Sequence, residues 1–344
     1  MLLVLVVLLT AGCGKSTDTV ESTATTVSSA DELPPTKAPP LPPEIRVSLD
    51  SYKGAENVGL LMAEKRGYFK DAGLNVWLGV PLRPSNTMYY VLTRMDELGV
   101  TQLPQVALAR ENGFPVEAVG SVVSQPTAAM IWLEGSDIKT MADLEGKTIG
   151  IPGIPFQEDL LRTVLEDAGL SFEDVDVQTL GYLLVPALLN GRVDAIFGGS
   201  WNIEGAALEA GGAKPVIKRV QDSGVPAWDE LVVVTRSDRV VADPEMIRAF
   251  MTAVRRGTEA AVRNPEAAAK VIRENSETSL AETNKRLTRK EAEAQLKATL
   301  PLLSKDGYVD PDRAADLIDW MHERGWIEKQ IPVSELLTNG LPPP

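Results

Sequence analysis

Residues 198–205 read Gly-Gly-Ser-Trp-Asn-Ile-Glu-Gly and combine side chains that suit binding of a flat, nitrogen-containing molecule. They follow the run VDAIF, which is typical of a buried strand. The two glycines let a ligand approach the backbone closely, and the indole of Trp201 suits stacking on a planar ring. Glu204 is expected one helical turn further on, on the same side, where its carboxylate can accept hydrogen bonds from ring N–H or amino groups. The alternative is that Trp201 packs in the core and Glu204 only favours the helix dipole.

A second turn of this kind occurs one strand–helix unit earlier, in GIPGIPFQED. Free backbone N–H groups at the start of the following helix favour an anion or a polar oxygen. The turn lacks the lysine and the spacing of a phosphate-binding GxxxxGK[ST] loop. It therefore predicts either a polar contact to a ligand or a tight turn without one.

Other polar side chains fall at the ends of predicted strands or at the start of a predicted helix. Taken singly, each is an ordinary loop residue, and only a shared cleft would give them a common role. The candidates are Asp50, Tyr52, Asn57, Ser85, Thr101, Gln102, Gln125 and Ser200.

Short strand-like runs alternate with helical runs from residue 44 onward, which predicts an α/β fold with mostly parallel sheets covered on both faces. We expect two doubly wound α/β lobes followed by a helical C-terminal part. The first lobe would comprise residues 44–130 and 237–344, and the second residues 131–236. Two crossings would form a hinge that closes a cleft around a small molecule, at the C-terminal ends of the strands.

Composition excludes several classes of function. The net charge of −14 argues against a nucleic-acid partner, because such a surface needs clustered Lys and Arg. Cys13 and His322 are the only residues of their types, which leaves no Cys/His zinc site and no Ser/His/Asp or Cys/His catalytic set unless His322 serves. We therefore expect no enzyme activity, no cofactor and no metal.

The N-terminus has the layout of an export signal. Residues 1–13 contain an apolar run of eight residues, then small residues and Cys13. This resembles a bacterial lipobox, although no Lys or Arg precedes the apolar run and Thr10 stands where Leu is usual. Residues 14–43 are rich in Ser, Thr and Pro, which predicts a disordered linker. We expect an extracytoplasmic protein anchored to a membrane through lipid on Cys13.

From about residue 45 to 342 the sequence resembles the NMT1/THI5-like family of solute-binding proteins, the receptors of ABC importers. The motifs are MAEKRGYFKDAGLNV, DLEGKTIGIPGIPFQEDLL, LVPALLNGRVDAIFGGSWNIEG, GVPAWDELVVV and LLTNGLPP. The thiamine-precursor (formylaminopyrimidine) binding group is the most similar. The resemblance implies a type II periplasmic-binding-protein fold, a pyrimidine stacked on Trp201 and hydrogen-bonded to Glu204, and a site lined by the Gly153, Pro155, Phe156 and Gln157 loop.

The resemblance leaves the ligand open. Residues 50–57 read DSYKGAEN and residues 101–104 read TQLP, and both depart from the pattern of that group. The alternatives are a thiamine pyrimidine precursor, riboflavin or another planar heterocycle, and an alkylsulfonate or nitrate. Pyrimidine synthases of related fold need a sequence rich in histidine and cysteine, whereas this chain has only the remote His322 and Cys13 at the signal junction. The implied partners are a small ligand and an ABC permease, and we expect a monomer.

Overall fold

The computed structural model describes residues 42–83, 86–276 and 287–340. The predictions for Cys13, for most of the linker and for Ser85 lie outside these residues. Within the described ranges, no helix is both long enough and apolar enough to cross a bilayer.

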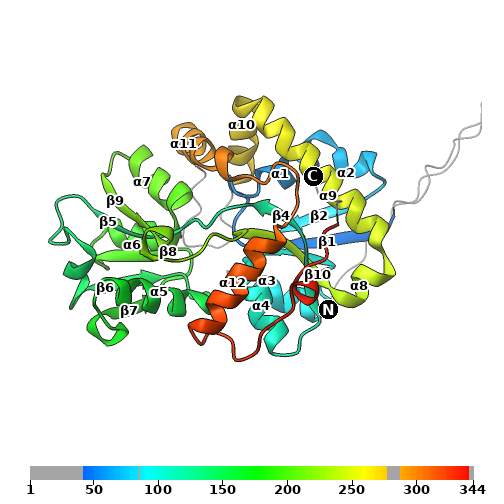
Figure 1. The fold of residues 1–344 in the computed structure, drawn as a ribbon. Helices are drawn as coiled ribbons and strands as arrows, with labels where there is room; N and C mark the ends of the chain where they lie inside the picture. Colours follow the sequence, from blue (N-terminus) through cyan, green and yellow to red (C-terminus); the bar gives the residue numbers. More distant parts are fainter. Residues whose placement is uncertain (1–41, 84–85, 277–286, 341–344) are drawn as a thin grey trace, which may run out of the picture. The chain divides into compact units, whose positions relative to one another are not determined.

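Two five-stranded sheets form the centres of two lobes (Figure 1). The first has the order β2-β1-β3-β10-β4 and the second β7-β6-β8-β5-β9. The strands of the first sheet are β1 (Glu44–Ser48), β2 (Asn75–Gly79), β3 (Leu98–Thr101), β4 (Val116–Val123) and β10 (Leu231–Arg236). Those of the second are β5 (Ala128–Leu133), β6 (Thr148–Ile151), β7 (Asp176–Thr179), β8 (Ala195–Ser200) and β9 (Pro215–Arg219).

Helices cover both sheets. Those of the first lobe are α1 (Val58–Arg66), α2 (Tyr68–Asp71), α3 (Asn86–Leu92), α4 (Leu103–Glu111), α8 (Ser237–Ala242), α9 (Pro244–Arg263), α10 (Pro265–Asn275), α11 (Arg289–Thr299), α12 (Pro311–Glu323) and α13 (Val333–Leu336). Those of the second are α5 (Phe156–Asp167), α6 (Leu184–Leu189) and α7 (Ala206–Ala210). The α/β class and the two-lobed fold expected from the sequence are confirmed. The expectation of mostly parallel sheets is wrong, because each sheet has two parallel and two antiparallel strand pairs.

The predicted lobe boundaries need a correction. Strand β10 was placed in the second lobe, but it lies in the first sheet, antiparallel to β3 and β4. Strand β5 lies wholly in the second sheet, antiparallel to β8 and β9. The crossings are therefore residues 124–127 and 224–230. The run LVVVTR is apolar and largely buried, so its pattern predicts a central strand without saying which sheet it joins.

Successive side chains of β5 contact helices on opposite faces of the second sheet. Met130 and Trp132 belong to the core cluster that includes α5, whereas Ala129 and Ile131 belong to the cluster that includes α6 and α7. Successive side chains of a strand point to opposite faces, so the sheet is buried on both sides (Figure 1).

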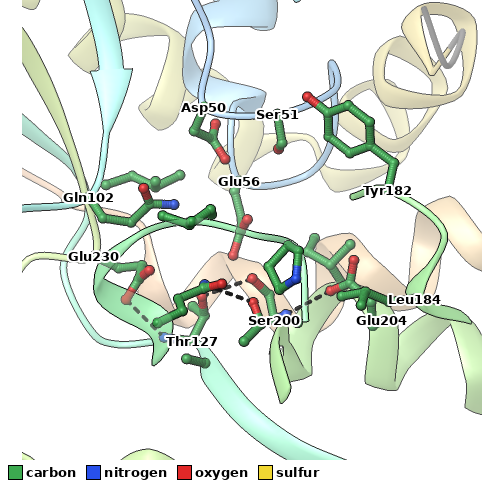
Figure 2. A pocket seen from close by; sticks show the side chains of 18 of the residues that line it. Asp50, Ser51, Glu56, Gln102, Thr127, Tyr182, Leu184, Ser200, Glu204 and Glu230 are labelled. Atoms are coloured by element: carbon green, nitrogen blue, oxygen red, sulfur yellow. Dashed lines mark hydrogen bonds between the residues drawn. The ribbon is translucent and has the colours of Figure 1, made fainter. Parts of the chain in front are cut away.

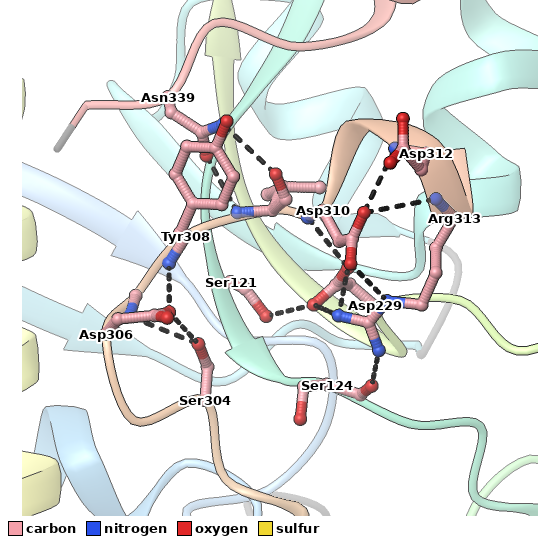
Figure 3. A network of polar contacts seen from close by, with 12 residues as sticks. Ser121, Ser124, Asp229, Ser304, Asp306, Tyr308, Asp310, Asp312, Arg313 and Asn339 are labelled. Atoms are coloured by element: carbon pink, nitrogen blue, oxygen red, sulfur yellow. Dashed lines mark hydrogen bonds and ion pairs between the residues drawn. The ribbon is translucent and has the colours of Figure 1, made fainter. Parts of the chain in front are cut away.

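A buried polar network ties the two crossings to α12 (Figure 3). The carboxylate of Asp229 is fully buried, and it accepts a hydrogen bond from the hydroxyl of Ser121 at 2.6 Å. Arg313, on α12, pairs with Asp229 at 3.3 Å and donates to the carbonyl oxygen of Ser124 at 2.6 Å. One side chain of α12 thus holds the start of one crossing and the end of the other.

Helices α1 and α9 cross at two glycines. A Cβ atom on Gly257 would lie 1.9 Å from the carbonyl oxygen of Gly59, and that contact is backbone, so it cannot rotate away. The helices touch there because neither has a side chain in the way.

Gly257→Ala should therefore lower the free energy of unfolding by about 2 kcal/mol or more, because the helices must separate to admit the methyl group. Urea denaturation measures it. Val262→Ala, at an exposed position of the same helix, is the matched control and should change stability by less than about 0.5 kcal/mol. Equal effects of the two substitutions would contradict the close crossing.

Candidate functional site

A cavity opens between the lobes at the C-terminal ends of β1, β3, β6, β7 and β8 (Figure 2). We call it the acidic pocket. The first lobe contributes Asp50, Ser51, Tyr52, Glu56 and Gln102. The second contributes Pro152, Ile154, Gln157, Gly181, Tyr182, Leu184, Gly198, Gly199, Ser200, Ile203 and Glu204. The crossings contribute Thr127 and Glu230, and the first residues of β5 and β10 contribute Ala128 and Leu231. This is the position where open α/β sheets bind ligands.

The structure brings six of the predicted site residues together on the wall of this pocket. They come from four separate segments of the chain, which meet only because the strand ends converge. The six are Asp50, Tyr52, Gln102, Gln157, Ser200 and Glu204.

Other predicted residues lie beside the pocket and not on its wall. Asn57 is buried behind Asp50 and donates from Nδ2 to its Oδ1 at 2.8 Å. Thr101 is buried and its hydroxyl accepts a hydrogen bond from Gln105. Phe156 packs in the core beside Trp326. These three side chains therefore contact other protein groups and are not among the residues that line the cavity.

Three further predicted residues also lie off the wall, all of them in loops. Gln125 is exposed at the first crossing. Gly153 and Pro155 flank Ile154, which does line the pocket. The loop predicted from the family resemblance thus reaches the pocket through Pro152, Ile154 and Gln157.

Trp201 is not on the wall, which differs from the expectation that it shares one side with Glu204. The segment Trp201–Gly205 forms a π-helical turn, in which hydrogen bonds run from i to i+5. A π-helical turn contains more residues than an α-helical turn, so two residues three positions apart are further from sharing one side of it. The side chains of Trp201 and Glu204 therefore point in different directions. The indole packs against the apolar clusters of both lobes, with the guanidinium of Arg219 3.8 Å from the ring centroid.

The double glycine has a steric reason. Gly198 has φ +75°, and a Cβ atom there would lie 2.5 Å from Oε1 of Gln157. A Cβ on Gly199 would press on Glu204 and Leu184 at 3.3 Å. The carbonyl of Gly198 accepts a hydrogen bond from Nε2 of Gln157 at 3.0 Å. The backbone of Gly198 and Gly199 therefore forms the floor of the pocket, and the side chains of Gln157 and Glu204 pack directly against it.

Four carboxylates line the pocket, whereas its described lining residues include no Lys, Arg or His. Each has neutral donors only. Glu204 accepts from the backbone N–H of Ser200 at 2.7 Å, and Glu56 accepts from Nδ2 of Asn202 at 3.1 Å. Glu230 accepts from the indole N–H of Trp228 at 3.2 Å and from the backbone of the first crossing. Figure 2 shows these side chains around one space.

Burial raises the pKa of every one of these carboxyls. Desolvation raises the pKa of Glu204 and that of Glu230 to about 7, against the ordinary 4.5, and the charge of Asp50 adds to both. The pKa of Glu56 lies well above its ordinary value because of desolvation and the charge of Asp50. The pKa of Asp50 is also raised by burial. A hydrogen-bond donor or a positive charge placed beside such a carboxyl stabilises its charged form.

Hydrogen bonds between the two lobes lie beside the pocket. Asn202, fully buried in the second lobe, donates to Glu56 and to the hydroxyl of Thr299 in the first, the latter at 2.9 Å. The hydroxyl of Tyr182 donates to the carbonyl of Pro81 across the cleft at 3.4 Å. The lobes therefore meet through uncharged donors placed beside the carboxylates.

Sequence reasoning missed Glu56, Tyr182 and Glu230 as site residues. Glu56 and Glu230 each come just before a long apolar run, GLLMA and LVVV, and a carboxylate next to a buried element is a signal that could have been used. Tyr182 follows the end of β7 in the same way that the predicted residues follow their own strands.

The raised pKa values predict how stability depends on pH. Unfolded glutamates lose their protons near pH 4.5, while Glu204 and Glu230 in the folded protein keep theirs until about pH 7. The folded state therefore binds more protons in this interval, and the free energy of unfolding should fall as pH rises from about 4.5 to about 7. Glu204→Gln should remove part of the fall and be more stable than the parent at pH 8, by on the order of 2 kcal/mol.

Urea denaturation at pH 5 and pH 8 measures this difference. Glu209→Gln, at an exposed position in α7, is the control and should shift neither value. If Glu204→Gln tracks the parent at both pH values, the carboxyl of Glu204 does not carry a raised pKa.

Comparison with known proteins identifies the family of this chain. A family described as NMT1/THI5 like matches residues 55–268. The formylaminopyrimidine-binding protein of Halalkalibacterium halodurans is 31% identical over 299 residues, covering 86% of this chain and 89% of that protein. The 4-amino-5-hydroxymethyl-2-methylpyrimidine phosphate synthase of Schizosaccharomyces pombe is 24% identical, over 60% of this chain and 62% of its own.

Solved structures agree on the fold. The periplasmic aliphatic sulphonate binding protein SsuA of Escherichia coli superposes with a TM-score of 0.67 at 17% identity, over 86% of this chain and 97% of that one. The alkanesulfonate-binding protein SsuA of Xanthomonas axonopodis pv. citri, bound to MOPS, gives 0.67 at 18% identity, over 88% and 100%. With more than half of its length matched by the family and a relative above 30% identity, this chain belongs to the NMT1/THI5-like family.

Proposed function

We propose that this chain is an extracytoplasmic solute-binding protein that captures a flat, nitrogen-rich heterocycle of the thiamine-pyrimidine type and delivers it to an ABC permease. The observation that carries the proposal is the acidic pocket: four carboxylates, three of them buried and Glu204 half-buried, and two tyrosines between two lobes. An aminopyrimidine offers N–H donors to the carboxylates and a ring face to the tyrosines.

The acidic lining of the pocket favours a nitrogen-rich heterocycle over a sulfonate, the ligand class for which the SsuA proteins of the same fold are named. A sulfonate carries a permanent negative charge, and the described lining of the pocket offers it four acidic groups and no cation. Burying an anion there without a partner is costly. Sharing a fold with the SsuA proteins is therefore no reason to expect a sulfonate ligand for this chain.

A binding role fits this chain better than catalysis. The relative with 31% identity is named as a binding protein, whereas the yeast synthase shares 24% over 60% of the chain. His322, the single histidine, is exposed near the end of α12 and is not among the residues that line the pocket.

Aromatic stacking is assigned here to Tyr52 and Tyr182 and no longer to Trp201. Both tyrosines line the pocket, one from each lobe, so a ring between them would hold the lobes together. Burial and neighbouring acids keep the pKa of both phenols above the ordinary value, so both stay neutral donors.

Isothermal titration with a panel of ligands tests the proposal. Formylaminopyrimidine and hydroxymethylpyrimidine should bind with a dissociation constant near or below about 1 μM, which corresponds to about −8 kcal/mol. MOPS and nitrate should show no binding because of the carboxylates. Tight binding of MOPS, or of riboflavin alone, would replace the proposed ligand class.

Paired variants test the stacking groups in the same assay. Tyr182→Ala should weaken pyrimidine binding by about tenfold or more, since it removes an aromatic contact worth about 1 kcal/mol and its buried area. Trp201→Phe, which keeps the packing behind the wall, should leave affinity within about twofold. The reverse order of effects would return the stacking role to Trp201.

We further propose that Cys13 is lipidated and anchors the protein. The apolar run, the small residues and the cysteine support this. In a bacterial host, the full chain should then fractionate with membranes, and Cys13→Ser should release it or leave it unprocessed, as judged by fractionation and mass spectrometry. Identical fractionation and mass for the two chains would refute lipidation.

A further inference from the structure

Gln102 carries an unpaired amide nitrogen on the wall of the acidic pocket. The residue follows β3 directly and is 7% exposed. Its Oε1 accepts a hydrogen bond from Nε2 of Gln105, which also donates to the hydroxyl of Thr101 at 2.9 Å. Its Nε2 has no hydrogen-bond partner in the described part of the chain, and it is not among the unpaired atoms there that lack accessible surface. This nitrogen is therefore open to the cavity.

The orientation of the Gln102 amide is fixed from behind the wall. Because Gln105 donates to Oε1, that oxygen is turned toward α4, and Nε2 is turned the other way. Figure 2 shows the amide end of Gln102 directed toward the space around which the carboxylates lie. The other amide nitrogen of the described lining, Nε2 of Gln157, is already paired with the carbonyl of Gly198. A buried N–H without an acceptor is unfavourable, and a ligand in the pocket can supply one.

The register of the first sheet places Gln102 beside Glu230. Strands β3 and β10 are antiparallel neighbours, and Thr101 lies opposite Val232. Gln102 is therefore level with Leu231, which directly follows Glu230. Both side chains line the same pocket. A long-range strand pairing thus brings an amide donor and a carboxylate together at one edge of the sheet.

Glu230 keeps an acceptor atom free next to this donor. It is 5% exposed, and its Oε2 accepts from the indole N–H of Trp228 at 3.2 Å and from the backbone N–H of Thr127 at 3.3 Å. Its Oε1 has no partner among the described residues and, like Nε2 of Gln102, is not one of the unpaired atoms that lack accessible surface. The complement of this pair is a ligand edge with an acceptor beside a donor.

Resting on the proposed function, we propose that Gln102 is the specificity-determining residue of the acidic pocket and that, with Glu230, it recognises one edge of an aminopyrimidine. Nε2 of Gln102 donates to the ring nitrogen next to the amino group, and the amino group donates to Oε1 of Glu230. A pyrimidinone of the same shape has a ring N–H and a carbonyl at these two places. It would face a donor with a donor and an acceptor with an acceptor, so the pocket selects amino rings over oxo rings.

Three compounds serve as probes: hydroxymethylpyrimidine, its oxo analogue, and its deaza analogue with a CH in place of the ring nitrogen next to the amino group. Isothermal titration to the full-length protein is done at pH 8, above the pKa of about 7 that burial gives Glu230, so that this carboxyl is charged. The deaza analogue should bind about tenfold more weakly, because the amide of Gln102 is left unpaired. The oxo analogue should bind about 100-fold more weakly or worse.

Substitutions assign these losses to the two residues. Gln102→Met removes the donor at similar volume and should bring the deaza analogue within about twofold of hydroxymethylpyrimidine. Gln157→Met is the matched control and should keep the tenfold ratio, because its Nε2 is paired within the protein. Glu230→Gln keeps one oxygen for Trp228 and Thr127 and can turn an NH₂ group to the ligand, so the preference for amino over oxo should narrow to about tenfold or less.

Ratios within each variant cancel any general loss of affinity and the changed basicity of the deaza ring, as in a double-mutant cycle. Thermal unfolding checks that each variant is folded.

The outcomes separate this inference from the function on which it rests. If hydroxymethylpyrimidine does not bind the parent protein, the proposed function is wrong and the recognition of its edge falls with it. If it binds, but the deaza ratio is absent in the parent or survives in Gln102→Met, Gln102 does not contact the ring nitrogen, and the proposed function stands. A preference for amino over oxo that is unchanged in Glu230→Gln removes Glu230 from the recognition.

Discussion

Four carboxylates, three of them buried and one half-buried, share one cavity whose described lining includes no cation, and the rest of the site depends on this constraint. Each charge is costly to remove from water, and each is only partly compensated by neutral donors such as the backbone of Ser200 and the amide of Asn202. The raised pKa values favour the protonated forms of these carboxyls, and the N–H donors of a ligand would favour the charged forms instead. Shape alone would leave the ligand class open, and this electrostatic arrangement narrows it.

The same constraint explains how the lobes meet. The described contacts across the cleft that lie at the pocket use amides and hydroxyls, such as Asn202 to Glu56 and Tyr182 to Pro81. A lysine or arginine placed there would neutralise the acids and compete with the ligand. The arginine that does reach the hinge, Arg313, is paired with Asp229 on the far side of Glu230, where it steadies the crossings without entering the pocket.

Much of the fold follows from sequence because strand and helix periodicities are strong, and because polar residues collect where strands end. Asp50, Gln102 and Glu204 are predicted by that rule, whereas Gln157 is predicted by the resemblance to the family. The rule fails where a local conformation is unusual: the π-helical turn moves Trp201 behind the wall, which a pattern of α-helical spacing does not anticipate. It also fails for Glu230, because its place on the wall depends on which sheet β10 joins, a long-range choice that no local pattern encodes.

The backbone floor at Gly198 and Gly199 has a consequence for how such a receptor diversifies. A side chain at Gly198 would be strained by its positive φ and would displace Gln157, and one at Gly199 would press on Glu204 and Leu184, so substitution at this pair is disfavoured. New specificities are then easier to reach by exchange of other lining residues, such as Gln102 and Leu184, than by substitution of the two glycines. Relatives with quite different cargo would then keep this glycine pair as a common ancestral feature.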